Sequence, residues 1–584
     1  MTPKHLLPLS LFVLAACGGG SKPAPEPTPD PTPASCDATG LSVTLLSPTG
    51  PVTTRGVVPV ALAISGQVDR VDLMRDGLVL ATLTAPYTFE WDTASVAEGT
   101  YQLLGRATCG TTRVTSAIQP VVVDRTPPSL TERSPAPGAE VAAGGAIRLD
   151  FSEPLLPSSV TADSLALKVD GQHVEASVAL SPDGRTLTLT PAQPLVAPAS
   201  AEVTLTDALT DGVGNAVVPP APWTFSVPRW LDAQGAVTLA AANERFAQPP
   251  ILQLDTAGRP ALVFRVASGP TGAYAARTSR WTGSAWTPLV DSGGSGSLAV
   301  AFAMGKEDRI MLSDLRDVGG WRLDLEYHTP RRTPASDFIF NCESPVAAVG
   351  PRGLGVVAAA YAISRVPPFV ILVEGFGDNG QVEFPDLPGA HEDEDQRLPA
   401  LAMDAEDRPV VAWLDERGAI AVARWKGTFW ELLGTRLPTQ GLSGEPTLRV
   451  DAQGRFVLAW REVEGSESRV RLHRFTTGDW SAMASPSGVA PPPAAAPSLA
   501  MDLDAEGNPV LAWTEAGSPA KVRVMRYSGS GWTSLDEVSR AGVDVLVGRG
   551  GLELDGRGQP VLATAVRAAE VSDVRVWRVN RLEP

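Results

Sequence analysis

The stretch Leu254-Asp255-Thr256-Ala257-Gly258-Arg259-Pro260, with the apolar residues 261–264 that follow it, decides the fold of the larger part of the chain. Its Asp-x-x-Gly core is a turn signal, because an aspartate side chain can accept hydrogen bonds from nearby backbone amides and glycine tolerates a positive φ. The short apolar run after the turn is typical of a strand. The stretch therefore predicts a β-hairpin.

The same frame recurs along the chain at intervals of 45–54 residues, which defines an internal repeat. Clear copies begin at Asp404, Asp451, Asp504 and Asp555, and two weaker copies begin at residues 305 and 350. Each unit continues with a strand that ends in an aromatic residue, then a turn and a tryptophan. Units of about 50 residues with four short strands are typical of a β-propeller. We predict a seven-bladed propeller over residues 228–584; six or eight blades also fit, since two copies are weak.

Both ends of this region are expected to share one blade. The seventh unit stops at residues 574–579 and lacks a final strand with a tryptophan. A matching piece, Trp230-Leu231-Asp232, stands just before the first unit. We expect this piece to complete the last blade and close the ring.

Residues 38–124 and 125–227 alternate short apolar strands with turn signals, which predicts two β-sandwiches. In the first, Asp76-Gly77 is a hairpin turn, and residues 85–92 and 98–101 resemble the bacterial Ig-like domains of cell-surface proteins. In the second, residues 147–155 and Asp211-Gly212-Val213-Gly214-Asn215 are similar to the Ig-like domain first described in S-layer proteins. The resemblance implies two spacer modules, so the fold class is all-β: two Ig-like sandwiches followed by a propeller.

The N-terminus carries an export signal. Lys4 and His5 precede an apolar run over residues 6–16, which is too short to span a bilayer. Leu14-Ala15-Ala16-Cys17 resembles the lipobox of bacterial lipoproteins, which implies cleavage after residue 16 and lipidation of Cys17. The proline-rich residues up to 37 form an extended tether. We expect an exported protein anchored to a membrane, at the outer membrane or cell surface.

The remaining cysteines suit an oxidising compartment. Cys36 lies at the entry to the first sandwich and Cys109 lies in a turn, so the two are a candidate disulfide. Cys342 is then left over, and we expect it to be buried.

Composition excludes one class of partner and favours no reaction. The formal net charge is −17 and no basic run occurs, which argues against nucleic acid. The sequence has no zinc-protease motif, nucleophile elbow or P-loop. We predict no cofactor; calcium is a weak candidate at the acidic runs 391–395 and 502–507, although neither has the full ligand pattern of a calcium loop.

Ligand contacts are predicted at a recurring carboxylate two positions after a strand tryptophan. Asp415, Glu462 and Glu515 occupy this position in neighbouring units, on the face where propeller ligands commonly sit. Together they could bind sugar hydroxyls, a cation or a basic partner, and the competing interpretation is ordinary loop chemistry. Most tryptophans recur at fixed repeat positions, as packing between blades requires. Trp321 and Tyr361 fall outside that pattern and are further ligand candidates.

These features predict a lipid-anchored binding or adhesion protein of the envelope, in which the sandwiches form a stalk and the propeller recognises a glycan or a protein. Two other classes stay open. One is a polysaccharide-acting hydrolase or lyase on a propeller scaffold, because a catalytic carboxylate pair is defined in space and not in sequence. The other is a purely structural envelope component.

Overall fold

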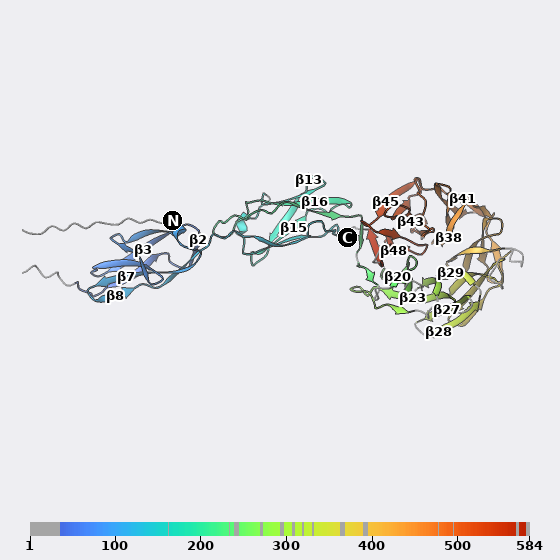
Figure 1. The fold of residues 1–584 in the computed structure, drawn as a ribbon, viewed down its shortest axis with the longest axis horizontal. Helices are drawn as coiled ribbons and strands as arrows, with labels where there is room; N and C mark the ends of the chain where they lie inside the picture. The colour runs from blue at the N-terminus through green and yellow to red at the C-terminus, as the bar shows by residue number, and fades with distance from the viewer. Residues whose placement is uncertain are drawn as a thin grey trace, which may run out of the picture.

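The computed structural model describes residues 36–579 except 162, 233, 239–243, 269–272, 292–296, 306–309, 318–320, 330–331, 341, 363–367, 389–394, 452, 477, 495 and 568–571. The described chain is all-β, with only two short 3-10 helices, η1 (Thr93–Ser95) and η2 (Pro157–Ser159). Two small β domains lie in line and lead to a ring of sheets (Figure 1). In these residues, no helix has the length and apolarity that a membrane crossing requires.

The first sandwich packs a small sheet against a larger one. Strand β3 shows the reason: Val58, Val60 and Leu62 alternate with exposed residues and point into the shared core. The sheets consist of β1 (Ser42–Ser47), β3 (Val57–Ser65) and β6 (Thr88–Asp92), and of β2 (Val52–Thr54), β4 (Arg70–Arg75), β5 (Leu78–Leu83), β7 (Gly99–Cys109), β8 (Thr112–Thr115) and β9 (Gln119–Val123).

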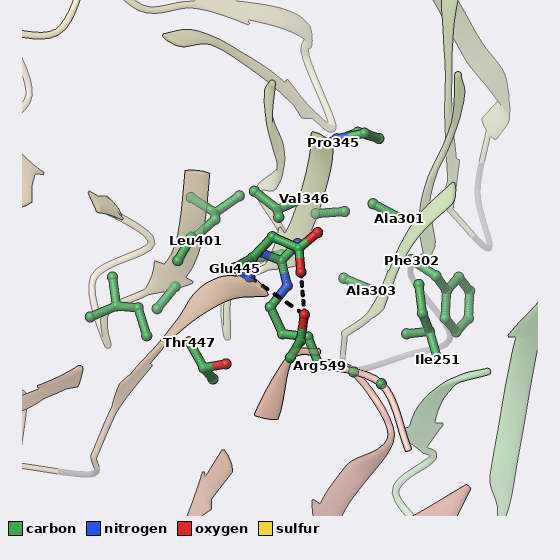
Figure 2. A pocket seen from close by; sticks show the side chains of 18 of the residues that line it. Ile251, Ala301, Phe302, Ala303, Pro345, Val346, Leu401, Glu445, Thr447 and Arg549 are labelled. Carbon is green, nitrogen blue, oxygen red and sulfur yellow. Dashed lines mark hydrogen bonds between the residues drawn. The ribbon is translucent and has the colours of Figure 1, made fainter. Parts of the chain in front are cut away.

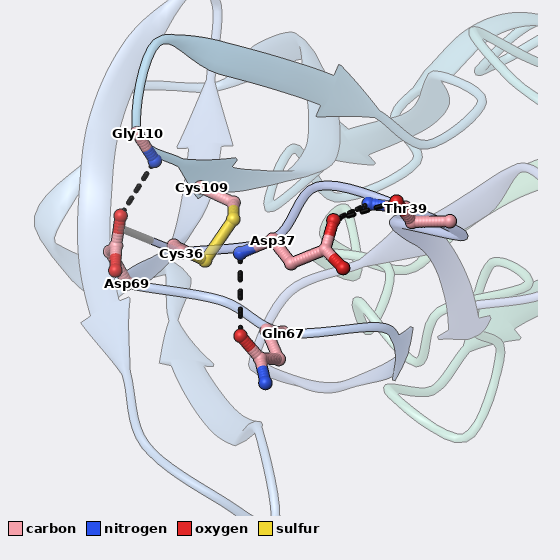
Figure 3. Close-up of a disulfide and its surroundings, with 7 residues drawn as sticks. All are labelled: Cys36, Asp37, Thr39, Gln67, Asp69, Cys109 and Gly110. Atoms are coloured by element: carbon pink, nitrogen blue, oxygen red, sulfur yellow. Dashed lines mark hydrogen bonds between the residues drawn. A yellow bond between two sulfur atoms is a disulfide. The ribbon is translucent and has the colours of Figure 1, made fainter. Parts of the chain in front are cut away.

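Cys36 and Cys109 are joined by a disulfide, with a Cα–Cα distance of 5.3 Å (Figure 3). The bridge links the start of the described chain to the end of β7, and the Asp69 carboxylate accepts a hydrogen bond from the neighbouring Gly110 amide at 2.6 Å. Cys342 lies outside any disulfide and is fully buried; burial raises the pKa of its thiol to about 12. The thiol is therefore protonated and inert at neutral pH.

The second sandwich has two four-stranded sheets around one apolar core, which includes the paired strand residues Leu149 and Leu187. The sheets consist of β10 (Leu130–Ser134), β11 (Ile147–Phe151), β15 (Thr186–Pro191) and β14 (Ala176–Leu180), and of β13 (Gln172–His173), β12 (Leu165–Val169), β16 (Ala199–Leu205) and β17 (Trp223–Val227).

The joint between the sandwiches is held by hydrogen bonds. The Asn215 side-chain amide donates to the backbone oxygens of Asp124 and Thr126 at 3.3 and 3.4 Å, and to the Asp211 carboxylate at 2.8 Å. Glu153 lies beside Asp124 and Asp211, and burial together with these two carboxylates raises the pKa of Glu153. These bonds tie the linker to the second sandwich.

Seven sheets follow the sandwiches, and we number them in chain order. Sheet 1 contains β20 (Glu244–Phe246), β21 (Ile251–Leu254), β22 (Pro260–Ser268), β23 (Ala273–Arg280) and β24 (Val290–Asp291). Sheet 2 contains β25 (Ser297–Met304), β26 (Ile310–Asp317), β27 (Trp321–Thr329) and β28 (Arg332–Phe340). Sheet 3 contains β29 (Cys342–Val349), β30 (Gly355–Tyr361), β31 (Val370–Gly377) and β32 (Gly380–Glu383).

The later sheets keep the same antiparallel order. Sheet 4 contains β33 (Arg397–Met403), β34 (Pro409–Leu414), β35 (Ala419–Trp425), β36 (Trp430–Leu432) and β37 (Leu437–Pro438). Sheet 5 contains β38 (Leu442–Val450), β39 (Phe456–Glu464), β40 (Glu467–Thr476) and β41 (Asp479–Ala482). Sheet 6 contains β42 (Leu499–Leu503), β43 (Pro509–Glu515), β44 (Lys521–Tyr527) and β45 (Trp532–Val538).

Sheet 7 combines both ends of the region. It contains β46 (Asp544–Leu546), β47 (Leu552–Leu554), β48 (Pro560–Arg567) and β49 (Ser572–Val579), and β18 (Trp230–Asp232) and β19 (Val237–Thr238) pair with β49. Each sheet contacts the next, and sheet 7 contacts sheet 1 through β47 and β21. Among the described residues, each of the seven interfaces holds an apolar cluster, so the core is distributed around the ring.

A repeated hydrogen bond at the outer edge shows that β18 takes the place of a missing outer strand. The indole N–H groups of Trp430, Trp480 and Trp532 each donate to a backbone oxygen of the preceding sheet region, at 2.7–2.8 Å. Trp230 makes the same bond to Leu535, at 2.8 Å. The segment 230–232 thus supplies the tryptophan that the seventh unit lacks.

The aspartate turns form as the repeat predicts, and they explain one weak copy. In the clear copies, one carboxylate oxygen accepts the amides two and four residues later, as Asp255 does from Ala257 and Arg259 at 2.9 Å. The copy at Gly350 has no aspartate of its own. Instead Asp407, from sheet 4, accepts the equivalent amides of Arg352 and Leu354 at 2.8 and 2.9 Å. A side chain at Gly350 would collide with this carboxylate, which accounts for the glycine.

Candidate functional site

A cavity of about 500 Å³ lies where the inner strands of the seven sheets converge. Its wall includes Ile251, Ala301, Val346, Leu401 and Thr447, which come from sheets 1 to 5 (Figure 2). Each inner strand pairs with only its own sheet neighbour, so its other edge faces the axis of the ring without a partner strand. The volume falls in the range of small-molecule sites. We call this space the central cavity.

One repeat position gives the central cavity a polar side. Six residues before each turn anchor, sheets 5, 6 and 7 carry Glu445, Ser498 and Arg549, whereas sheets 1 to 4 carry proline, alanine, serine and leucine. The Ser498 hydroxyl donates a short hydrogen bond to the Glu445 carboxylate. The three polar residues are neighbours because they occupy the same place in adjacent sheets.

Arg549 reaches across the ring. Its Nη1 donates to the backbone oxygen of Pro399 in sheet 4, at 2.9 Å. Burial lowers the pKa of the Arg549 guanidinium and the charge of Glu445 opposes that shift. For Glu445, burial is outweighed by the Arg549 charge and the Ser498 hydrogen bond, so its pKa is lowered. A charged donor and a charged acceptor thus stand together in the cavity.

A second repeat position forms a polar cluster closer to the turns. Two residues before the anchor, sheets 5, 6 and 7 carry Arg449, Asp502 and Glu553, sheet 1 carries Gln253, and sheets 2 to 4 carry alanine. Burial and the charge of Asp502 raise the pKa of Glu553 to about 8, and burial likewise raises the pKa of Asp502. Arg449 lies 3.8 Å from Asp502.

This second cluster mainly connects sheets. Asp502 accepts the Leu554 amide of sheet 7 at 2.7 Å, and Glu553 accepts the Leu254 amide of sheet 1 at 2.5 Å. Gln253 accepts the Met304 amide of sheet 2 in the same manner, at 3.1 Å. These side chains therefore bridge three consecutive interfaces between sheets. The described residues six positions before the anchor, which include Arg549, form no such series of bonds to the amides of the next sheet.

The three carboxylates predicted to contact a ligand are buried and have protein partners. Glu462 accepts the Trp460 indole N–H at 2.9 Å and pairs with Arg471, while Glu515 accepts the Trp513 indole N–H at 3.0 Å. Asp415 caps its own turn and pairs with Arg436. The spacing of two residues reflects this local bonding, because residues i and i+2 share a strand face. The structure gives the ligand prediction at these positions no support.

The other predicted site residues lie away from the central cavity or outside what is described. Tyr361 ends β30 and packs against the apolar cluster between sheets 2 and 3. Trp321 begins β27, but its side chain lies outside the described residues, as do Cys17 and most of the acidic run 391–395. Within the other acidic run, Asp504 accepts the amides of Glu506 and Asn508, as the other turn aspartates do.

Sequence reasoning missed Glu445, Ser498, Arg549 and the second cluster. A signal was present: when the seven units are aligned on their anchors, charged residues occur in the columns six and two residues upstream only in units 5 to 7. The recurring tryptophans occupy positions that build the frame of the sheets. Positions that vary between repeats were the better guide to the cavity.

Comparison with known families identifies the N-terminal part. Residues 42–104 match a family described as a bacterial Ig domain, and residues 124–227 match one described as a bacterial Ig-like domain. The two sandwiches are bacterial Ig-like domains. The second match covers all strands from β10 to β17, whereas the first begins at β1 and ends within β7. Among curated proteins the chain has no match.

Several solved structures resemble parts of the chain at low identity. Fibronectin(III)-like modules of Clostridium thermocellum CbhA share 17% identity, covering 32% of this chain and 94% of theirs, with a TM-score of 0.18. A PL25 ulvan lyase shares 9% identity over 59% of this chain and 96% of its own, with a TM-score of 0.40. The fucose-specific lectin of Aleuria aurantia shares 11% identity over 52% of this chain and all 100% of its own, with a TM-score of 0.34. TM-scores of this size support no inference about function.

Proposed function

We propose that residues 228–584 form a seven-bladed β-propeller that binds a ligand in the central cavity, and that the two Ig-like domains carry it as a stalk. The observation that carries the proposal is the polar side of the cavity. Buried charge is costly unless it is paired or used, and Glu445, Ser498 and Arg549 converge on one open space from three sheets.

The stalk role is supported by the linear order of the domains and by the Ig-like family matches (Figure 1). With the lipobox-like sequence at Cys17, it fits a protein of the cell envelope that is tethered to a membrane. Labelling of the expressed chain with a radioactive fatty acid tests the tether. Label that disappears in Cys17→Ala supports the anchor, and label that persists refutes it.

A propeller-based enzyme that acts on polysaccharides is the second candidate. Glu553 favours it, because a carboxyl with a pKa of about 8 beside a second carboxyl, Asp502, is the arrangement that a general acid requires. The bond from the Leu254 amide to Glu553 favours a structural role instead. The enzyme is supported if the protein turns over a hydrolase or lyase substrate and Glu553→Gln loses that turnover.

Binding in the cavity can be tested with a filling substitution. Purified full-length protein in detergent is screened on a glycan array, and any hit is measured again with Ala301→Phe, which places a ring in the cavity. We expect binding to weaken at least about tenfold. Ala257→Phe, the same change in an exposed turn of sheet 1, is the matched control and should bind normally. Equal binding by Ala301→Phe, folded as judged by circular dichroism, contradicts the proposal.

A further inference from the structure

The guanidinium of Arg549 is the feature of the central cavity with unused bonding capacity. Arginine has five N–H donors, and one protein acceptor, the Pro399 oxygen, is seen for Arg549. No ion pair joins Arg549 to a carboxylate in the described chain. Other arginines of the ring do have such partners: Arg408 pairs with Asp404 at 2.7 Å and Arg455 with Asp451 at 2.6 Å. Arg549 thus presents free donors to an open space.

The neighbours of Arg549 supply acceptors of a different kind. Glu445 is stabilised in its ionised form, and the Ser498 hydroxyl already occupies one of its oxygens. A carboxylate has about four lone-pair directions, so Glu445 can still accept a hydrogen bond from a ligand hydroxyl. Strong acceptors and strong donors therefore lie next to each other on this wall.

The lining that sheets 2 and 3 contribute is mostly apolar. Ala301 and Ala303 of sheet 2 and Val346 of sheet 3 face the cavity there (Figure 2). Such a surface can contact the C–H face of a ring. A volume of about 500 Å³ accommodates a ligand of one or two sugar rings.

We propose that the central cavity binds a hydroxy-carboxylate of the sugar-acid type, with its carboxylate on Arg549 and a neighbouring hydroxyl on Glu445. The planar fork of arginine matches the two oxygens of a carboxylate, which a neutral sugar lacks. Glu445 disfavours an anion without hydroxyls, because like charges repel and no donor would face it. This inference rests on the proposed function, which names the cavity as the site but not its ligand.

Titration calorimetry on full-length protein in detergent tests the ligand class. The probes are D-galacturonate and D-glucuronate, with D-galactose and D-glucose as neutral counterparts. We expect a uronate to bind at least about tenfold more tightly than its neutral sugar, which corresponds to about 1.4 kcal/mol. Arg549→Gln should abolish that preference and Arg549→Lys, which keeps the charge without the fork, should retain part of it. Arg557→Gln, the same change in an exposed turn of sheet 7, should leave it unchanged.

The outcomes separate the two proposals. If neutral sugars bind as well as uronates, and Ala301→Phe still abolishes their binding, the cavity is the site but the sugar-acid assignment is wrong. If uronates bind and neither Ala301→Phe nor Arg549→Gln weakens their binding, both proposals fail. Absence of uronate binding overturns the sugar-acid assignment alone, and the glycan array then decides the proposed function. A preference for uronates that persists in Arg549→Gln and is lost in Ala301→Phe would show that Arg549 does not bind the carboxylate.

Discussion

Sheets 5 to 7 and sheets 1 to 4 share one repeat but differ in what they present to the central cavity. At the positions six and two residues before the turn anchor, sheets 5 to 7 carry five charged residues and a serine. Sheets 1 to 4 carry one glutamine, one serine and otherwise apolar residues at the same positions. The order of the strands is common to both groups, and the difference at these positions is one of side-chain chemistry.

This difference separates two tasks. Positions that stay alike around the ring, such as the turn aspartates and the outer tryptophans, connect each sheet to itself or to the preceding sheet. Positions that differ decide the character of the cavity. A repeat protein can change its site without changing its frame, because each sheet needs only its neighbours for stability.

The largest expected effect is on the frame. Trp513→Ala removes a fully buried side chain from the cluster between sheets 5 and 6, together with its bond to Glu515. We expect a loss of about 3–5 kcal/mol in the unfolding free energy of the ring. Scanning calorimetry of the full chain measures it, with Arg549→Gln as the comparison. A similar loss in Arg549→Gln would show that the polar side of the cavity belongs to the frame.

A smaller loss of stability is expected where a side chain of one sheet accepts hydrogen bonds from a turn of another. Asp407→Ala leaves the Arg352 and Leu354 amides of sheet 3 without their carboxylate. We expect a loss of about 1–2 kcal/mol, comparable to the loss of a helix cap. Glu406→Ala, which removes only an exposed ion pair with Arg408, should cost less than about 0.5 kcal/mol. Equal values for the two variants would mean that the contact between sheets 3 and 4 is incidental.

A third expected effect is a pH dependence at Glu553, which Asp502, Arg449 and the Leu254 amide face. Its pKa is raised from 4.5 to about 8, so the folded ring holds a proton that the unfolded chain releases. The stabilisation is complete below about pH 4.5 and is lost as pH rises through about 8.

Glu553→Gln mimics the protonated carboxyl and should remove this dependence. We expect the Tm of the wild-type ring to fall between pH 5.5 and 8.5 by about 2–4 °C more than that of Glu553→Gln. Thermal unfolding at both values measures the difference. Parallel curves for the two proteins would place the Glu553 pKa near that of the unfolded chain.

Much of the fold could be predicted because turn chemistry is local. Asp255 and its equivalents bond to amides two and four residues away, so the pattern is legible in the sequence and counts the repeats. The partner for residues 230–232 followed from a missing tryptophan in the seventh unit. The Asp407 contact to sheet 3 could not be predicted, since it depends on two units meeting in space.

The candidate site was harder to predict from the sequence than the fold, for a related reason. Asp415, Glu462 and Glu515 recur at a regular spacing, and that regularity reflects a local bond to an indole or a turn. The sequence around Arg549 does not indicate its role. That role depends on Glu445 in another sheet and on the backbone oxygen of Pro399 across the ring. Recurrence identifies what every sheet needs. A ligand site on the ring axis is made by residues that do not recur.

The most direct test of the account is a crystal structure of the full chain soaked with D-galacturonate. We predict seven sheets closed by β18 on β49, with the sugar carboxylate on the Arg549 guanidinium and a hydroxyl on Glu445. An open arrangement of sheets, or a sugar bound elsewhere while Arg549 and Glu445 contact only the protein, would contradict it.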